Sequence, residues 1–231
     1  MAILCIAGVS GPARTDTAGL DDQRVNFYID DEVAYFNAER LAEILVLHGA
    51  PAIVRHVPFG RATHLLETES PGCGFMVARE LPGRDSFHWI AVTLRGDLVI
   101  ATADPAVRKP SIGDFVASYG AKLLVDMLTQ HHYQALVFRS NSQLAKLLDA
   151  NRTPFVAYFE PGLEALQIEL GRPLAIAERL RHLDLWLGCN AATSIQAVES
   201  ISRAWKAGMA SGEIPESYRA MKSLDFLPDQ R

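Results

Sequence analysis

The strongest constraint on the fold is an alternation of short apolar strands and amphipathic helices near the N-terminus. The pattern of strand, helix, strand, helix and strand over about 55 residues is typical of a parallel, doubly wound α/β sheet. The sequence predicts strands at Arg24–Ile29, Ala52–Val57 and Gly74–Ala78, and helices at Ala38–His48 and Arg61–Glu67.

The first of these helices has clear signals at both ends. Leu41, Ile44, Leu45 and Leu47 recur at helical spacing. Asn37 is a residue type that caps helix N-termini, and Gly49 is one that ends helices. We therefore expect a helix bounded by these two residues.

A second alternating set follows, and two extended segments connect it to the first. It is expected to contain strands at Ala135–Arg139 and Phe155–Phe159 and helices at Gly120–His131, Ser142–Ala150, Leu163–Leu170 and Leu174–Leu180. The extended connections are the runs His88–Leu94 and Leu98–Ala103 on the way in and Leu183–Cys189 on the way back; helices Thr193–Ser211 and Pro215–Lys222 then close the chain. Two crossings between α/β lobes predict a hinge that closes around a ligand. We expect one lobe from residues 23–98 plus 183–231 and a second from residues 99–182.

Composition limits the classes of partner. Of 231 residues, 49% are hydrophobic, which is ordinary for a globular protein and excludes general disorder. The formal net charge of −5 gives no field that would attract nucleic acid or an anionic membrane surface. No apolar stretch approaches the roughly 18 residues of a spanning helix. We therefore expect neither nucleic-acid binding nor direct membrane insertion.

The N-terminus and the cysteines bear on location. Residues 1–22 carry a short apolar run and then small residues, and we interpret them as a degenerate or truncated secretory leader; a cytoplasmic tail or a first strand is the alternative. Cys5, Cys73 and Cys189 lack zinc or redox spacing. We interpret Cys73 and Cys189 as buried free thiols, and as a disulfide pair if the leader that contains Cys5 is removed.

Five segments, in order, resemble the family 3 extracellular solute-binding proteins, the polar-amino-acid type of bacterial periplasmic binding protein. The similar segments are AERLAEILVLHGA, VPFGRATHLLE, GFMVARELPGRDSFHW, KPSIGDF and AVESISRAWKAGMASGEIPESYRAM, and together they span about residues 24–222. The resemblance implies a two-lobed type II periplasmic-binding fold that holds a ligand between its lobes, usually for a membrane importer or a sensor.

The resemblance also implies a set of binding residues. Arg84 falls where such proteins hold a ligand carboxylate, and a guanidinium suits that role because it donates two parallel hydrogen bonds. Pairing of Arg84 with Glu80 or Asp85 on the surface is the alternative. The other implied ligand contacts are Arg79, Tyr35, Phe36, Arg61, Ser118 and Glu160. For Tyr35 and Phe36 a core position, and for Glu160 a turn, remain alternatives.

Catalytic and metal motifs are missing from the sequence. His131 and His132 are adjacent, so on a helix they point in different directions and grip no common metal. We expect no catalytic residue, no cofactor and no metal. The leading hypothesis is a periplasmic, monomeric, non-enzymatic protein that binds a small polar or anionic, amino-acid-like solute for ABC-type uptake or sensing, with a membrane permease or sensor as partner. The alternatives are a cytoplasmic regulatory module and a small-acid dehydratase-like enzyme of the same fold.

Overall fold

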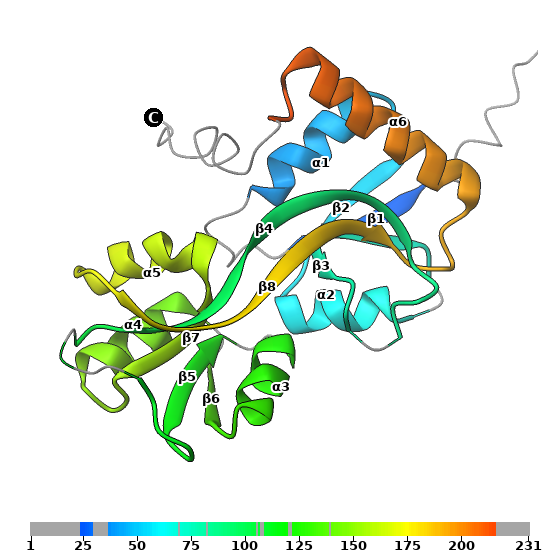
Figure 1. The fold of residues 1–231 in the computed structure, drawn as a ribbon. Helices are drawn as coiled ribbons and strands as arrows, with labels where there is room; N and C mark the ends of the chain where they lie inside the picture. Colours follow the sequence, from blue (N-terminus) through cyan, green and yellow to red (C-terminus); the bar gives the residue numbers. More distant parts are fainter. Residues whose placement is uncertain are drawn as a thin grey trace, which may run out of the picture.

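The computed structural model contains one hydrogen-bonded sheet of eight strands. It describes residues 24–29, 37–68, 70–81, 83–104, 106, 109–119, 122–138 and 140–215. The strand order is β2-β1-β3-β8-β4-β7-β5-β6 (Figure 1). In chain order the elements are β1 (Val25–Ile29), α1 (Ala38–Leu47), β2 (Ala52–His56), α2 (Phe59–Leu66), β3 (Gly72–Ala78), β4 (His88–Thr102), β5 (Phe115–Tyr119), α3 (Lys122–Gln130), β6 (Gln134–Phe138), α4 (Asn141–Asp149), β7 (Phe155–Phe159), the short helix η3 (Glu160–Gly162), α5 (Leu163–Leu170), β8 (Ala175–Cys189) and α6 (Ile195–Ser211).

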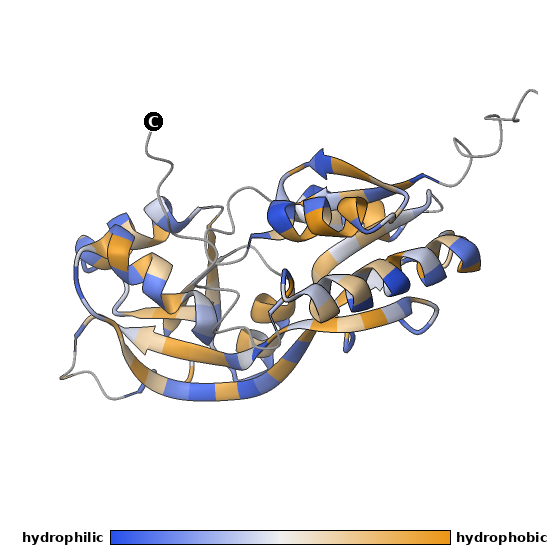
Figure 2. Cartoon of the chain, turned by 90° about the horizontal axis from the view of Figure 1, so that it is seen from above, coloured by the Kyte–Doolittle hydropathy of each residue, from blue (hydrophilic) through white to orange (hydrophobic). Residues whose placement is uncertain are grey.

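The elements gather into two lobes, and the α/β class expected from the sequence is confirmed. Lobe 1 consists of β1 to β3 with α1, α2 and α6, and lobe 2 of β5 to β7 with α3, α4 and α5 (Figure 1). Apolar faces of the helices meet the sheet in each lobe (Figure 2). Phe27, Ile44 and Ile201 are fully buried in lobe 1, as are Leu144 and Leu166 in lobe 2.

Helix α1 shows how local signals set an element. The Asn37 side chain accepts a hydrogen bond from the backbone N–H of Arg40 at 2.8 Å, as expected of an N-cap. Leu41, Ile44 and Leu45 form the buried face, whereas Leu47 at the end of the helix is exposed. Gly49 follows the helix with a φ of 86°, a left-handed conformation that glycine adopts without strain.

Strands β4 and β8 are each 15 residues long and continue through both lobes. They pair antiparallel from His88↔Cys189 to Thr102↔Ala175, so this strand pair belongs to the sheet of both lobes. The prediction of a helix at Leu174–Leu180 is wrong: residues from Ala175 onward belong to β8. Apolar residues there have a helical spacing, but hydrogen bonds to β4 and the burial of the neighbouring strands override that local preference.

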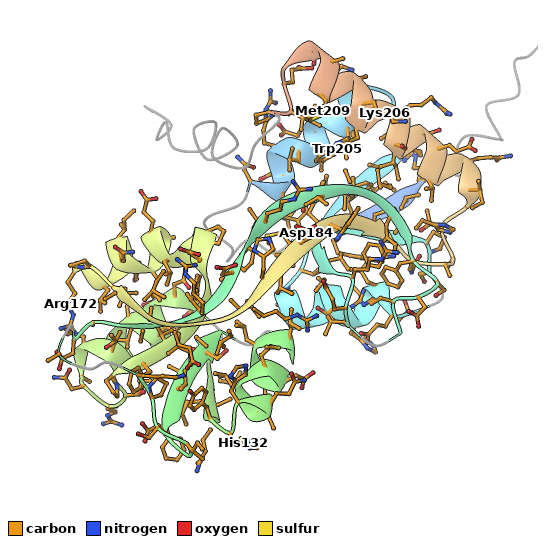
Figure 3. All side chains as sticks on the ribbon, viewed as in Figure 1. His132, Arg172, Asp184, Trp205, Lys206 and Met209 are labelled. Atoms are coloured by element: carbon orange, nitrogen blue, oxygen red, sulfur yellow. A yellow bond between two sulfur atoms is a disulfide. The ribbon has the colours of Figure 1, made fainter. Side chains whose placement is uncertain are left out.

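The crossing between the lobes is more polar than the lobes themselves. The middle of β8, residues 178–184, reads ERLRHLD, and hydrophilic residues dominate this part of the long strand (Figure 2). Asp184 marks the place on the ribbon (Figure 3). Of the described elements, only β4 and β8 continue from one lobe into the other, so a bend between the lobes would have to occur in these two strands.

The carboxyl ends of the parallel strands of both lobes face this crossing. In lobe 1, β3 ends at Ala78, which pairs with Leu185 near the middle of β8, and β1 and β2 run parallel to β3. In lobe 2, β7 ends at Phe159, which pairs with Leu98 of β4, and β5 and β6 run parallel to β7. Ligands of open α/β sheets bind outside the carboxyl ends of strands.

A disulfide joins Cys73 of β3 to Cys189 of β8, and the two residues are also cross-strand partners. The interpretation of these cysteines as free thiols is therefore wrong, because the register brings two buried thiols face to face from positions 116 residues apart. The suspected leader, residues 1–22, and the expected helix Pro215–Lys222 lie outside the described residues apart from Pro215. None of the described helices has the length and apolar character needed to cross a bilayer.

Candidate functional site

Arg84 is the most unusual side chain in the described part of the chain. It lies in the loop that follows β3, and only 2% of it is exposed. Its Nη2 contacts Oε1 of Glu67 at 3.4 Å, but its Nε and Nη1 are buried without a hydrogen-bond partner. Burial lowers the pKa of this guanidinium, and the Glu67 charge only partly opposes that effect. Burying a cation whose N–H donors have no acceptor lowers the stability of the fold, unless an anion accepts those hydrogen bonds.

Aromatic rings connect Arg84 to Arg79. The Arg84 guanidinium lies 4.6 Å from the centroid of the Phe87 ring, and Phe87 stacks on Trp89 at 5.6 Å. Arg79, which is exposed, lies 5.8 Å from the centroids of both Trp89 and Trp186. These cation–π contacts hold Arg79 at the carboxyl end of β3 and Arg84 nearer the amino end of that strand, where Phe87 lies beside Gly188, the partner of Gly74.

Gly188 of β8 allows this aromatic row to form. A β-carbon there would lie 2.8 Å from Cζ3 of Trp89, closer than real side chains approach. Phe87 is buried and Trp89 is partly buried, so the rings have little freedom to move aside. The positions of Arg79 and Arg84 thus depend on a residue more than 100 positions later in the chain.

Lobe 2 contributes a charged network at the end of β7. Both carboxylate oxygens of Glu160 accept hydrogen bonds from Arg179, from Nη1 and, at 2.8 Å, from Nη2. Arg179 also donates to Oδ2 of Asp97 at 2.6 Å, and Oδ1 of Asp97 lies 2.7 Å from Nδ1 of His182. Hydrogen bonds from His182 and Arg179 lower the pKa of Asp97, and the two carboxylates raise that of Arg179.

The remaining residues that the sequence implied fall in different places. Ser118 is fully buried in β5, where it pairs with Ala157 of β7. Arg61 is exposed on α2. Tyr35 and Phe36 lie outside the described residues. Arg79 and Arg84 thus lie at opposite ends of one aromatic row on lobe 1, and Glu160 directly follows β7 in lobe 2.

Sequence reasoning missed Glu67, Arg179 and His182. Glu67 directly follows α2, and its contact with Arg84 depends on the packing of that helix beside the β3–β4 loop. Arg179 and His182 were hidden because the segment before Leu183 reads as a helix rather than as the middle of a long strand. Charged and apolar residues do not alternate in RLRHLD, where the two leucines are three positions apart, so this segment carries no clear strand signal.

The arrangement suits binding more readily than catalysis. A carboxylate can accept two hydrogen bonds from a guanidinium either from Nε and one Nη or from both Nη nitrogens. In Arg84 either arrangement would use at least one nitrogen that has no partner, because Nε and Nη1 are both unpartnered. Within the described ranges, no group of three or more His, Cys, Asp or Glu side chains is placed to hold a metal ion. What this site offers chemically is a buried cation that an anion can neutralise.

Comparison with known proteins bears on the fold. No protein-family model matches this chain, and no curated protein sequence matches it. Many solved structures do. An amino acid ABC transporter substrate-binding protein of Streptococcus pneumoniae, with L-arginine bound, has a TM-score of 0.70 at 11% identity over 90% of this chain and 98% of that one.

Two further structures have the same architecture. The GluR0 ligand-binding core of Nostoc punctiforme, in complex with L-glutamate, has a TM-score of 0.68 at 14% identity and covers 89% of this chain and 100% of that one. A putative L-cystine ABC transporter protein of Listeria monocytogenes has a TM-score of 0.70 at 9% identity over 88% of this chain and 95% of that one. The chain therefore has the type II periplasmic-binding fold that the sequence resemblance implied.

Proposed function

We propose that this chain is a non-enzymatic solute-binding protein that closes its two lobes around a small solute bearing a carboxylate. The observation that carries the proposal is the buried Arg84, whose Nε and Nη1 have no partner. An anion at this position would satisfy donors that otherwise cost stability. Solved structures of the same fold hold amino acids, L-arginine and L-glutamate among them.

Closure follows from where the binding groups lie. The exposed Arg79 directly follows the carboxyl end of β3 in lobe 1, and the end of β7 in lobe 2 borders the same crossing of β4 and β8, while Arg84 lies deeper in lobe 1 beside Phe87. A ligand that contacts both edges makes all its contacts only when the lobes approach, so binding shifts the population toward the closed form. We place the lobe boundaries at residues 98/99 and 182/183. Arg79, Tyr35, Phe36, Arg61, Ser118 and Glu160 stay our proposed contributors to the two edges.

The disulfide supports a location outside the cytoplasm. Stable structural disulfides form in oxidising compartments and are rare in the cytosol. Cys73 and Cys189 are joined inside the core of lobe 1, where both are fully buried. We infer a periplasmic protein that acts as a monomer and delivers its solute to a membrane permease or reports it to a sensor.

Calorimetric titration with a panel of small carboxylates tests the proposal. The panel contains L-arginine, L-glutamate, L-aspartate, glutarate, succinate and lactate. At least one member should bind, and Arg84→Lys should weaken that binding about tenfold or more, because an ammonium does not reproduce the guanidinium's paired hydrogen bonds.

Arg203→Lys is the matched control, because among the described residues this exposed arginine on α6 pairs with Ser200 and Glu199 of its own helix. It should bind as the wild type does. Small-angle scattering should show a more compact protein with the bound solute than without it. Binding that is unchanged in Arg84→Lys, or no binding by any member of the panel, would contradict the proposal.

A further inference from the structure

The carboxylate of Glu160 already has a full set of partners. Arg179 donates to both of its oxygens, so the pair is bidentate, the strongest arrangement that these groups form. Arg179 is itself held by Asp97 at 2.6 Å, which leaves it little freedom to swing away. Only 34% of the Glu160 side chain and 24% of that of Asp97 are exposed.

The backbone places these groups together before any ligand arrives. Asp97 and His182 are cross-strand partners on β4 and β8, and Arg179 lies three residues earlier on the same strand as His182. Pro161, which follows Glu160, packs against Gly96 of β4. Arg179 is therefore tethered beside Glu160 at a high effective concentration, and an external cation must displace it to reach the carboxylate.

This network makes the facing edge of lobe 2 unsuited to an ammonium group. An incoming ammonium would find Glu160 neutralised and would meet the positive charge of Arg179. On lobe 1, Glu67 is paired with Arg84, while Glu80 and Asp85 are exposed to water, where charges attract weakly. At the carboxyl end of β3, the exposed guanidinium of Arg79 lies over Trp89 and Trp186 and offers donors to an anion. Among the described residues, the balance of unpaired charge at the two edges favours a purely anionic solute.

We infer, on the basis of the proposed function, that the solute is a small carboxylic acid without an ammonium group, and that Arg179 is the residue that sets this specificity. Arg179 acts by donating hydrogen bonds to both oxygens of the Glu160 carboxylate and so neutralising its charge. The protein then selects organic acids over the amino acids of the same carbon skeleton.

Matched pairs of ligands test the inference. Succinate and L-aspartate, and glutarate and L-glutamate, differ only by one α-ammonium group. Calorimetry should show that the unsubstituted acid of a pair binds about tenfold more tightly or better, as expected for one unfavourable charge contact. Arg179→Gln frees Glu160, so it should gain affinity for the amino acid of the pair and lose the preference.

One variant serves as a control and another as a second test. Arg181→Gln removes a charge from an exposed residue two positions further along the same strand and should keep the wild-type preference. Glu160→Gln leaves Arg179 without this carboxylate partner, so the preference for the unsubstituted acid should be kept or strengthened. If Glu160 instead received a ligand ammonium, Glu160→Gln would lose amino-acid affinity selectively.

The outcomes separate this inference from the proposed function. Tighter binding of L-aspartate or L-glutamate by the wild type would overturn the inference and leave solute binding intact. An unchanged preference in folded Arg179→Gln would overturn the role of Arg179. If Arg179→Gln does not fold, the Glu160→Gln result decides the same question. Absence of binding by all four acids and by the wider panel would overturn both.

Discussion

Gly96 of β4 and Pro161 of η3 are in close contact at the crossing between the lobes. A β-carbon at Gly96 would lie 2.6 Å from both Cγ and Cδ of Pro161, and the proline ring is too rigid to yield. Gly96→Ala should therefore lower the free energy of unfolding by about 1–3 kcal/mol, the usual cost of overpacking. Urea denaturation measures this change.

Gly60→Ala is the control for that variant. No atom lies within 4 Å of a β-carbon at Gly60, and the residue lies in helix α2, where alanine is the better helix former. Its stability should be unchanged or raised. Equal stability of the two variants would show that Gly96 and Pro161 are not in contact.

The disulfide should be a major source of stability. It closes a loop between positions 116 residues apart, so it restricts the unfolded chain strongly. A variant with Cys73→Ala and Cys189→Ala should lose about 2–5 kcal/mol of unfolding free energy in urea denaturation. A reducing agent should destabilise the wild type in the same direction and leave the variant unaffected. Labelling of both cysteines by a thiol reagent in unfolded, unreduced protein would contradict the pairing.

The elements that the sequence predicted well are those set by local signals. Asn37 and Gly49 delimit α1, and the parallel alternation at the N-terminus follows from short apolar runs between helices. The start of β8 was mispredicted because its residues satisfy a helical pattern, and only the distant β4 makes them extended. The pairing of Cys73 with Cys189 likewise depends on sheet register, which no local pattern specifies.

The candidate site was partly predictable for the same reason. The position of Arg84 after β3 follows from the order of motifs, because the loop between two strands is a local feature. Burial of the Arg84 guanidinium could not be predicted in this way, because it also depends on Glu67, which follows α2 and is 17 residues away in the sequence. The pairing of Glu160 with Arg179 required β8 to be recognised as a strand.

Tyr133 should make stability fall at alkaline pH. It donates a hydrogen bond to Oε2 of Glu178 at 2.7 Å, and burial together with this carboxylate raises its pKa from 10.0 to about 12. The unfolded chain then releases the phenolic proton at lower pH than the folded protein does. Unfolding free energy should therefore decrease as the pH rises from about 10 to about 12. Tyr133→Phe should show a shallower decrease in urea titrations across that range; an identical slope would contradict the raised pKa.

Replacing Arg84 should stabilise the protein while it abolishes binding. Two buried nitrogens without partners disfavour the ligand-free fold, and methionine keeps an unbranched chain against Phe87. Arg84→Met should thus raise the free energy of unfolding of the ligand-free protein by about 1–3 kcal/mol. The same variant should lose any thermal stabilisation by the bound acid.

Arg172 provides the contrast to Arg84. It lies at the far end of lobe 2 (Figure 3), its Nε is also buried without a partner, and its Nη2 donates to the carbonyl of Leu148 at 3.1 Å. Arg172→Met removes one of the hydrogen bonds that this carbonyl accepts, another coming from the N–H of Asn151, so it should lose stability and retain binding. Differential scanning fluorimetry with and without the tightest-binding acid measures both effects. A less stable Arg84→Met that still binds the acid would mean that Arg84 has a structural role. An arginine that holds the ligand should lower the stability of the ligand-free protein and raise that of the bound protein.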